Sequence, residues 1–125
     1  MYSVIVRDHI MIAHSLPDPF FGPASQMHGA TYVVDAEFKA QELNEHNVVI
    51  DIGEAQRVLS EVLGALNYKN LDGESQFEGK LTTTEFLANY IHARITAVMH
   101  RTFKGMLKIT LGESHVAWAS YESEV

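Results

Sequence analysis

The sequence predicts an α+β domain whose elements follow the order β-β-α-α-β-β, with two helices on one face of an antiparallel four-stranded sheet. Three observations lead to this prediction. Two long segments near the N-terminus alternate in hydrophobicity, two central segments repeat with helical spacing, and two short segments at the end alternate again. The chain of 125 residues, 46% hydrophobic and 20% charged, is typical of one globular domain spanning residues 1–125.

The first two elements are expected to be long strands that pair antiparallel. In residues 2–14 the even-numbered hydrophobic side chains share one face with His14. All three prolines lie in residues 15–27, so this segment is expected to be a long connection. Residues 28–39 then alternate again and form the second strand.

The first helix is expected directly after a short strand-like run at residues 48–50. Asp51 stands at an N-cap position, and Glu54 follows three residues later. Hydrophobic residues then recur at spacings of three and four and form one stripe. The stripe consists of Ile52, Ala55, Val58, Leu59, Val62, Leu63 and Leu66.

The second helix follows a segment of turn composition at residues 69–79. Thr82 and Glu85 have the spacing of a capping box, in which the Glu side chain reaches back to a backbone N–H group. Two short alternating segments complete the chain, at residues 106–112 and 116–121, and both are expected to be strands.

A sheet of this size leaves two open edges and one face without helices. Several copies that join edge to edge would remove both edges and enclose that face, so the sequence predicts a symmetric homo-oligomer that assembles into a barrel.

Charge and cysteine content exclude several classes of function. Nine Lys and Arg against sixteen Asp and Glu give a net charge of −7, which repels nucleic acid and anionic membrane surfaces, so neither is expected as a partner. The chain has no cysteine and therefore no disulfide, thiolate metal site or cysteine nucleophile. No hydrophobic run is long enough to span a membrane and no signal pattern begins the chain, so a cytoplasmic protein is expected.

Two of the seven histidines are candidates for a metal or ligand site. An H-x-H pattern at the start of a strand would direct two imidazoles at one ion, but here His28 is followed by Ala30. Together with His14 the chain offers two nitrogens, whereas a stable zinc site needs at least three protein ligands. His14 and His28 are therefore expected to line a polar pocket or interface, and no metal is expected. The other five histidines have no ligand-like spacing, and most of them are expected on the surface; they are His9, His46, His92, His100 and His115.

Two acidic residues allow more than one interpretation. Glu113 follows the inward-facing residues of its strand, so it either turns into solvent where the strand ends or accepts paired N–H donors from a ligand such as a pterin or guanine. Glu85 fits the capping box on pattern alone. No nucleotide-binding loop, nucleophile elbow or metalloprotease motif is present. The residues alone therefore predict an oligomeric α+β domain with a polar pocket.

Six short segments, in order along the whole chain, resemble the 6-pyruvoyl tetrahydropterin synthase and 6-carboxy tetrahydropterin synthase family. They are Ile12–Leu16, Met27–Tyr32, Val49–Asp51, Leu66–Leu71, Thr82–Ala88 and Glu113–Tyr121. The resemblance implies the tunnelling fold, or T-fold, which has the element order derived above. It also implies trimers that close a twelve-stranded barrel, hexamers of two stacked trimers, and pockets at the subunit junctions.

The same resemblance implies that the catalytic machinery of the family is missing. The family's three zinc ligands fall on His14, His28 and Ala30, and alanine cannot coordinate zinc. Zinc polarises a substrate oxygen while a thiolate takes the proton, so loss of metal ligand, base and relay together predicts no synthase activity. The family's catalytic cysteine and its Asp-His relay fall on Ala24, Asn67 and Tyr68.

The residues that bind the pterin in the family are better retained. The family's T-x-E motif matches Thr83, Thr84 and Glu85, and its pterin-anchoring glutamate matches Glu113. The resemblance thus favours a protein that binds a pterin-like or purine-like ligand without performing the synthase reaction, as a homohexamer and without zinc. Two alternatives stay open: a divergent lyase or epimerase with a metal held by His14, His28 and an unidentified ligand, and a structural or regulatory hexamer with a vestigial pocket.

Overall fold

The computed structural model describes residues 1–125 and contains four long strands and two α-helices in the order expected from the sequence. Three short 3-10 helices lie in the connections, at Pro19–Ser25, Leu71–Gly73 and Ser75–Phe77. The strands and α-helices are β1 (Tyr2–His14), β2 (His28–Ala40), α1 (Ile52–Gly64), β3 (Lys69–Asn70), α2 (Thr84–Met99), β4 (Met106–Ser114) and β5 (Ala117–Glu124).

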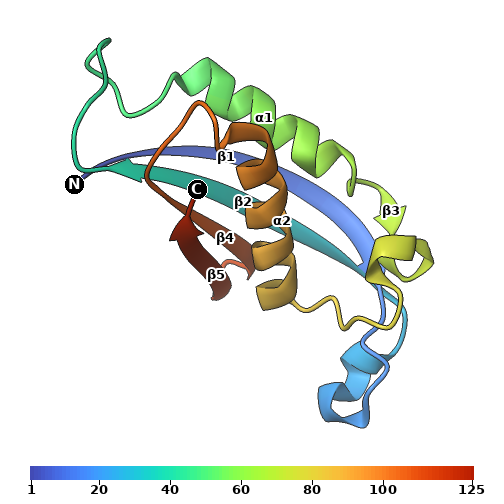
Figure 1. Ribbon diagram of the computed structural model, residues 1–125. Coiled ribbons are helices and arrows are strands. Elements are labelled where there is room, and N and C mark those ends of the chain that lie inside the picture. The colour runs from blue at the N-terminus through green and yellow to red at the C-terminus, as the bar shows by residue number, and fades with distance from the viewer.

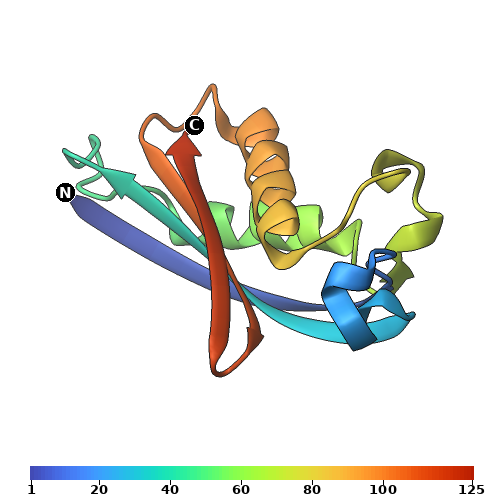
Figure 2. The ribbon, with the colours of Figure 1, turned by 90° about the horizontal axis from the view of Figure 1, so that it is seen from below.

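The strands form one sheet in the order β3-β1-β2-β4-β5. The four long strands are antiparallel to their neighbours, and both α-helices cover one face while the other face carries no helix (Figures 1 and 2). The predicted α+β class and element order are confirmed. The difference is β3, two residues in a segment predicted as a turn, which pairs in parallel with Ile12 and Ala13 at the edge of β1.

Alternation along the strands separates a hydrophobic face under the helices from a polar face. The buried core consists of inward-facing residues of β1, β2 and β4 and of one side of each helix, and the partly buried Tyr121 of β5 packs against it. On the helix-free face the Arg7 guanidinium binds the Asp35 carboxylate at 2.6 and 3.0 Å, and Lys39 Nζ binds Glu122 at 2.5 Å. Such exposed pairs contribute about 1 kcal/mol or less each, so the core holds the fold together.

The helix starts show where pattern and structure differ. Asp51 is the N-cap of α1 and accepts from the Glu54 N–H at 2.9 Å, as predicted. The N-cap of α2 is Thr83, which accepts from Phe86 N–H at 3.1 Å, so the predicted capping box on Thr82 is wrong by one residue. The run at residues 48–50 forms bends, so the strand expected there is wrong too.

One histidine expected on the surface is buried. His92, on the inner side of α2, is 5% exposed, and its Nε2 donates to the carbonyl oxygen of Ser123 at 3.1 Å. Its ring also packs edge-on against Tyr121. His92 therefore fastens α2 to β5. Neither helix has the length and apolar character that crossing a bilayer requires.

Candidate functional site

The two candidate histidines meet where β1 ends and β2 begins. His14 pairs with His28 in the strand register, and their ring centroids are 4.6 Å apart. His14 is 3% exposed, and a hydrogen bond of 2.9 Å joins its Nδ1 to Oγ1 of the equally buried Thr82. The hydroxyl of Thr82 thus binds His14, and Thr83 caps the helix.

The environment of His14 favours the uncharged imidazole. Burial lowers the pKa of His14 from its usual 6.5, and the neighbouring His28 lowers it further, while Asp72 acts in the opposite direction. Nδ1 of His28 donates to the Gln26 carbonyl oxygen at 2.8 Å. Both rings therefore have one nitrogen engaged by an oxygen of the chain and a second nitrogen, Nε2, left over.

The residues around this pair do not fit the zinc ion that the resemblance implies. No group of three or more His, Cys, Asp and Glu side chains lies close enough together to hold a metal. Ala30, two residues after His28 on the same face of β2, presents only a methyl group. The chain supplies two nitrogen ligands, and a zinc site needs three or four.

The positions of the family's base and relay carry groups with structural contacts. Ala24 lies in the first 3-10 helix, where its carbonyl oxygen accepts from Leu16 N–H at 3.1 Å. Oδ1 of Asn67 accepts from Met11 N–H at 2.9 Å, and the Tyr68 N–H donates to the Met11 carbonyl at 2.7 Å. Asn67 and Tyr68 thus bind both backbone groups of one edge residue of β1 and set the start of β3.

The carboxylate side of the site is built by a bulge in the β4–β5 hairpin. The pairing of these strands shifts between Gly112 and Ser114, which leaves Glu113 without a partner in β5. The strand continues to Ser114, so Glu113 belongs to β4, yet its side chain is exposed. The Thr84 hydroxyl donates to Glu113 Oε2 at 3.4 Å, which is the one hydrogen bond that the carboxylate accepts.

Glu85 lies beside Glu113, at the positive end of the α2 dipole. Because Thr83 is the cap, Glu85 occupies the second position of the helix and has no capping bond. Neither carboxylate forms an ion pair, and both are exposed. The two acids line a pocket of 150 Å³ with Thr84, Ala117, Trp118 and Ala119.

A buried tyrosine lies close to the carboxylates, beneath the start of α2. Tyr32, on the inner face of β2, is 1% exposed. Burial raises the pKa of the Tyr32 phenol above its usual 10.0, the Thr84 side chain lowers it, and Glu113 and Glu85 raise it further. Its phenol therefore stays protonated as a donor near the carboxylates. Alternation alone cannot distinguish such a residue from an ordinary core aromatic.

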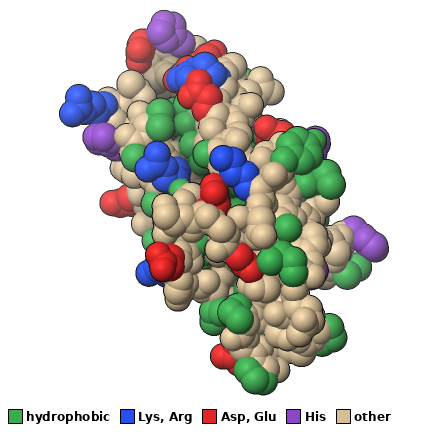
Figure 3. Space-filling model, turned by 90° about the vertical axis from the view of Figure 1, so that its right-hand side faces the viewer, with side chains coloured by type: hydrophobic (Ala, Val, Ile, Leu, Met, Phe, Trp, Pro, Cys, Tyr) green, Lys and Arg blue, Asp and Glu red, His purple; other side chains and the backbone are tan.

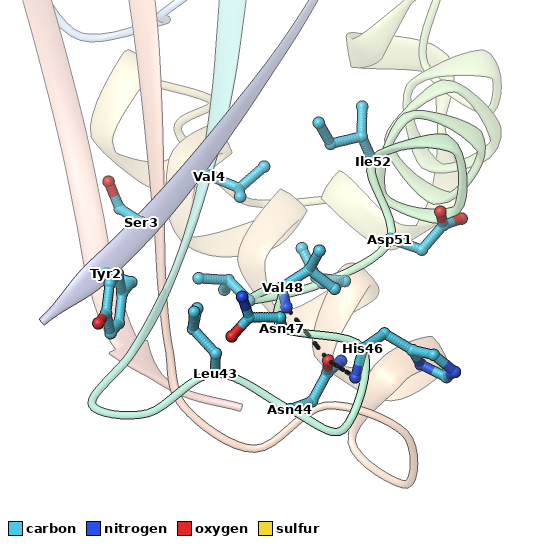
Figure 4. Close-up of a pocket in the computed structure, with 12 residues that line it drawn as sticks. Tyr2, Ser3, Val4, Leu43, Asn44, His46, Asn47, Val48, Asp51 and Ile52 are labelled. Carbon is cyan, nitrogen blue, oxygen red and sulfur yellow. Dashed lines mark hydrogen bonds between the residues drawn. The ribbon is translucent and has the colours of Figure 1, made fainter.

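The largest hollow of the chain lies elsewhere. It measures about 620 Å³ and lies between the start of β1 and the loop before α1 (Figure 4). Its polar groups bind one another: Oδ1 of Asn44 accepts from His46 and Val48 N–H groups, and Asp51 caps α1. None of the predicted site residues lines it, so size alone does not make it the functional site.

Comparison with known proteins places the whole chain in one family. The family model of 6-pyruvoyl tetrahydropterin synthase matches residues 3–124. The solved structure of 6-pyruvoyl tetrahydropterin synthase from Caenorhabditis elegans is similar with a TM-score of 0.84 and 21% identity, over 98% of this chain and 95% of that chain. The same enzyme from Plasmodium falciparum gives 0.79 and 15%, over 99% and 98%.

A third solved structure, an uncharacterized protein from Wolinella succinogenes, has a TM-score of 0.69 and 13% identity over 96% of this chain and 97% of that one. No curated protein sequence matches the chain. At these identities the structures show a shared fold, and the family model extends over nearly every residue. The chain belongs to the 6-pyruvoyl tetrahydropterin synthase family.

Proposed function

We propose that the chain binds a pterin-like or purine-like heterocycle through Glu113 and does not catalyse the synthase reaction of its family. The observation that carries the proposal is the state of Glu113, an exposed carboxylate at a bulge with one long hydrogen bond from Thr84. A pterin or guanine presents two adjacent N–H donors in one plane, which a carboxylate accepts in parallel. Each such bond contributes about 1–3 kcal/mol.

The pocket is large enough to hold one ring of the ligand. A cavity of 150 Å³ is about what one benzene ring occupies in a protein interior, so the pocket has room for the amino-pyrimidine ring and leaves the rest of the ligand outside. Glu85 and Thr84 provide further acceptors and a hydroxyl at its wall.

The same positions support the absence of synthase chemistry. Proton abstraction beside a hydroxyl or carbonyl group needs a base and an electrophile, each of which contributes about 10²–10⁴ in rate. Ala24 has no titratable group, Asn67 has its side-chain oxygen bound to Met11, and Ala30 replaces a metal ligand. We therefore propose a binding protein, assembled as a homo-oligomer through its open sheet edges.

Calorimetry with neopterin, biopterin, sepiapterin and guanosine tests the proposal. We expect binding by at least one pterin, and a loss of affinity of about a hundredfold in Glu113→Gln, because both charge-assisted bonds weaken together. The matched control is Glu122→Gln, which removes another exposed carboxylate from the same hairpin but lies outside the pocket. Absence of binding by all four compounds would contradict the proposal, as would equal binding by Glu113→Gln and wild type.

A further inference from the structure

Four of the nine Lys and Arg residues lie in one segment of the chain that contains no acid. Between Glu85 and Glu113 there is no Asp or Glu, and this segment includes most of α2, the loop after it and most of β4. The other five cations share the rest of the chain with all sixteen acids. Positive charge in this acidic protein is therefore concentrated in one segment.

Three of these four cations are exposed on α2 and the loop that follows it. Arg94 and Arg101 are seven residues apart, so they lie on the same side, and Lys104 follows after the helix has ended. His100, the exposed C-cap residue, lies between them in the chain. The fourth cation, Lys108, lies on the helix-free face of the sheet. We refer to Arg94, His100, Arg101 and Lys104 as the basic patch.

Cations outside the acid-free segment are mostly paired with acids of the same chain. Four of those five form such an ion pair. Arg57 on α1, for example, binds Glu54 at 2.7 Å and Glu61 at 2.6 Å. On the face shown in Figure 3, several Lys and Arg side chains lie beside Asp or Glu side chains. The basic patch, by contrast, forms no ion pair within the chain, so its charge is left for an acid of another molecule.

The end of α2 accounts for only part of the basic patch. Lys104 Nζ donates to the His100 carbonyl oxygen at 2.7 Å, and Nδ1 of His100 donates to the Thr96 carbonyl oxygen at 3.2 Å. Cations in the last turn also interact favourably with the helix dipole. Arg94 lies before the last turn, and neither Arg94 nor Arg101 donates a side-chain hydrogen bond within the chain. The two arginines therefore have no structural role in the single chain.

Apolar side chains lie between the two arginines on the outer side of α2. Ala97 and Val98 stand three and four residues after Arg94, so they share its side of the helix. Both are exposed, and Val98 is 50% exposed. No other element covers the side of α2 that faces away from the sheet (Figure 2). Because α2 is apolar on this side as well as toward the core, its pattern is typical of a helix that packs against two neighbours.

We infer that the basic patch, with Ala97 and Val98, binds an acidic amphipathic helix of another protein. The arginines offer paired donors to Asp or Glu side chains, and the apolar residues between them contact apolar side chains of the partner. A helix repeats its side chains at spacings of three and four, so it can present acids and apolar groups with the spacing found on α2. The contact between Arg94 and Arg101 extends over about 10 Å, or roughly two helical turns.

Neither nucleic acid nor a second copy of the chain matches the basic patch as well. The net charge of −7 repels a long polyanion, and a phosphate backbone gives Val98 no apolar contact. The acids on the outer side of α1, Glu54 and Glu61, are already bound to Arg57, so a second copy does not supply free carboxylates there.

Fluorescence anisotropy with three labelled peptides of about 14 residues, roughly four helical turns, tests the inference. The first consists of Glu and Leu, with Leu at spacings of three and four. The second has Gln in place of each Glu, and the third has Ser in place of each Leu. We expect the wild-type protein to bind the first peptide, more weakly at higher salt, and the other two at least tenfold more weakly. The inference is overturned if the first peptide does not bind, or if the third peptide or single-stranded DNA binds equally well.

Arginine variants test whether the peptide binds at the basic patch. Arg94→Gln should weaken binding of the Glu–Leu peptide about threefold, and Arg94→Gln with Arg101→Gln about tenfold. The matched control is Arg57→Gln, on the outer side of the other helix, which should leave the affinity unchanged because Arg57 is already paired. Unchanged affinity in the double variant would place the peptide elsewhere and overturn the inference.

A valine variant tests the apolar part of the contact. Val98→Thr keeps the shape of the side chain and all charges, and it should weaken binding of the Glu–Leu peptide about threefold. The control is Val116→Thr in the β4–β5 turn, where Val116 is exposed but far along the chain from α2. Equal affinities of Val98→Thr and wild type would show that charge alone attracts the peptide, contrary to the inference.

Sedimentation velocity distinguishes a different protein from a second copy as the partner. We expect the variant with Arg94→Gln and Arg101→Gln to have the same oligomeric state as wild type. If the variant forms smaller species, a second copy covers the basic patch and the inference is overturned. None of these measurements involves Glu113, so the proposed function stands or falls separately.

Discussion

Two regions lie at the same end of the sheet: the histidine corner, formed by His14 and His28, and the carboxylate pocket, lined by Glu85 and Glu113. They differ in how many hydrogen bonds their polar groups form within the chain. His14 and His28 are bound within the chain, to Thr82 and to the Gln26 carbonyl. Glu113 is exposed and has a single contact at 3.4 Å, and Glu85 has none. In the first region one nitrogen of each ring is bound within the chain, whereas in the second most of the acceptor capacity is left for a ligand, a partner or water.

The two histidines have contacts of the kind that orient metal ligands. In both histidines one ring nitrogen is held by an oxygen, as in metal sites where the outer contact orients the ligand. We therefore expect that the two histidines lack only a third donor, at the position of Ala30, to hold a metal. The carboxylate pocket keeps both its acids and its helix N-terminus.

The largest effect is expected from restoring that donor. Ala30→His places a third imidazole two residues from His28 on the same face of β2 and opposite Ile12. With the Nε2 atoms of His14 and His28 unengaged, we expect a three-histidine zinc site and about one zinc per chain, against a trace in wild type. The measurement is elemental analysis after stripping with chelator, adding zinc and dialysis.

The control for this gain of metal is Ala30→His with His28→Ala, which has the new imidazole but two ligands in total. It should bind as little zinc as wild type. A wild-type chain that already holds one zinc per chain after this treatment would contradict the interpretation of the histidine corner.

A smaller effect is expected when the hydrogen bond between Thr82 and His14 is removed. Thr82→Val keeps the shape of the side chain but leaves Nδ1 of buried His14 without a partner. An unsatisfied buried polar group costs about 1–3 kcal/mol, so urea unfolding should show that loss of stability. The matched control is Thr31→Val on the exposed face of β2, which should change stability by about 0.5 kcal/mol or less. Equal losses in the two variants would contradict the role assigned to Thr82.

The next prediction concerns the cap of α2. Thr83→Ala should cost about 1 kcal/mol of stability because the bond to Phe86 N–H is lost. Glu85→Gln should cost about half as much, since only its interaction with the helix dipole is removed. Thermal or urea unfolding distinguishes the two. If Glu85→Gln proves the more destabilising, Glu85 is a structural residue and not a free acceptor.

The sequence predicted the long elements because periodicity over many residues reports which face is buried. It failed where a single hydrogen bond decides which residue caps a helix or whether a short strand forms. Three consecutive threonines offer overlapping caps; in the structure Thr83 caps the helix, while Thr82 binds His14, 68 positions away in the chain. Strand β3 exists because Asn67 and Tyr68 bind the backbone of Met11, and two residues carry no periodic signal.

The carboxylate pocket illustrates the same limit. Alternation left open whether Glu113 ends a strand or faces a ligand, because a bulge changes the direction of a side chain without changing the pattern. The placement of Glu113 beside Thr84 needed the fold itself. The resemblance to the family, by contrast, pointed to both acids. Motifs of a family mark residues that meet in its shared fold, even where they lie far apart in the sequence.

The smallest expected effect is a difference in pH dependence. Because burial and His28 lower the pKa of His14 in the folded chain, the unfolded chain binds this proton more readily below the usual value of 6.5. The neutral form thus favours folding fully above about pH 6.5, and the advantage falls as the pH drops through the lowered folded pKa. In His14→Gln this contribution is absent, so its stability should fall less steeply between about pH 6.5 and pH 5. Urea unfolding of both proteins across this range measures the difference. Parallel curves would show that His14 titrates alike in the folded and unfolded chain, so that its burial against His28 costs the charged form nothing.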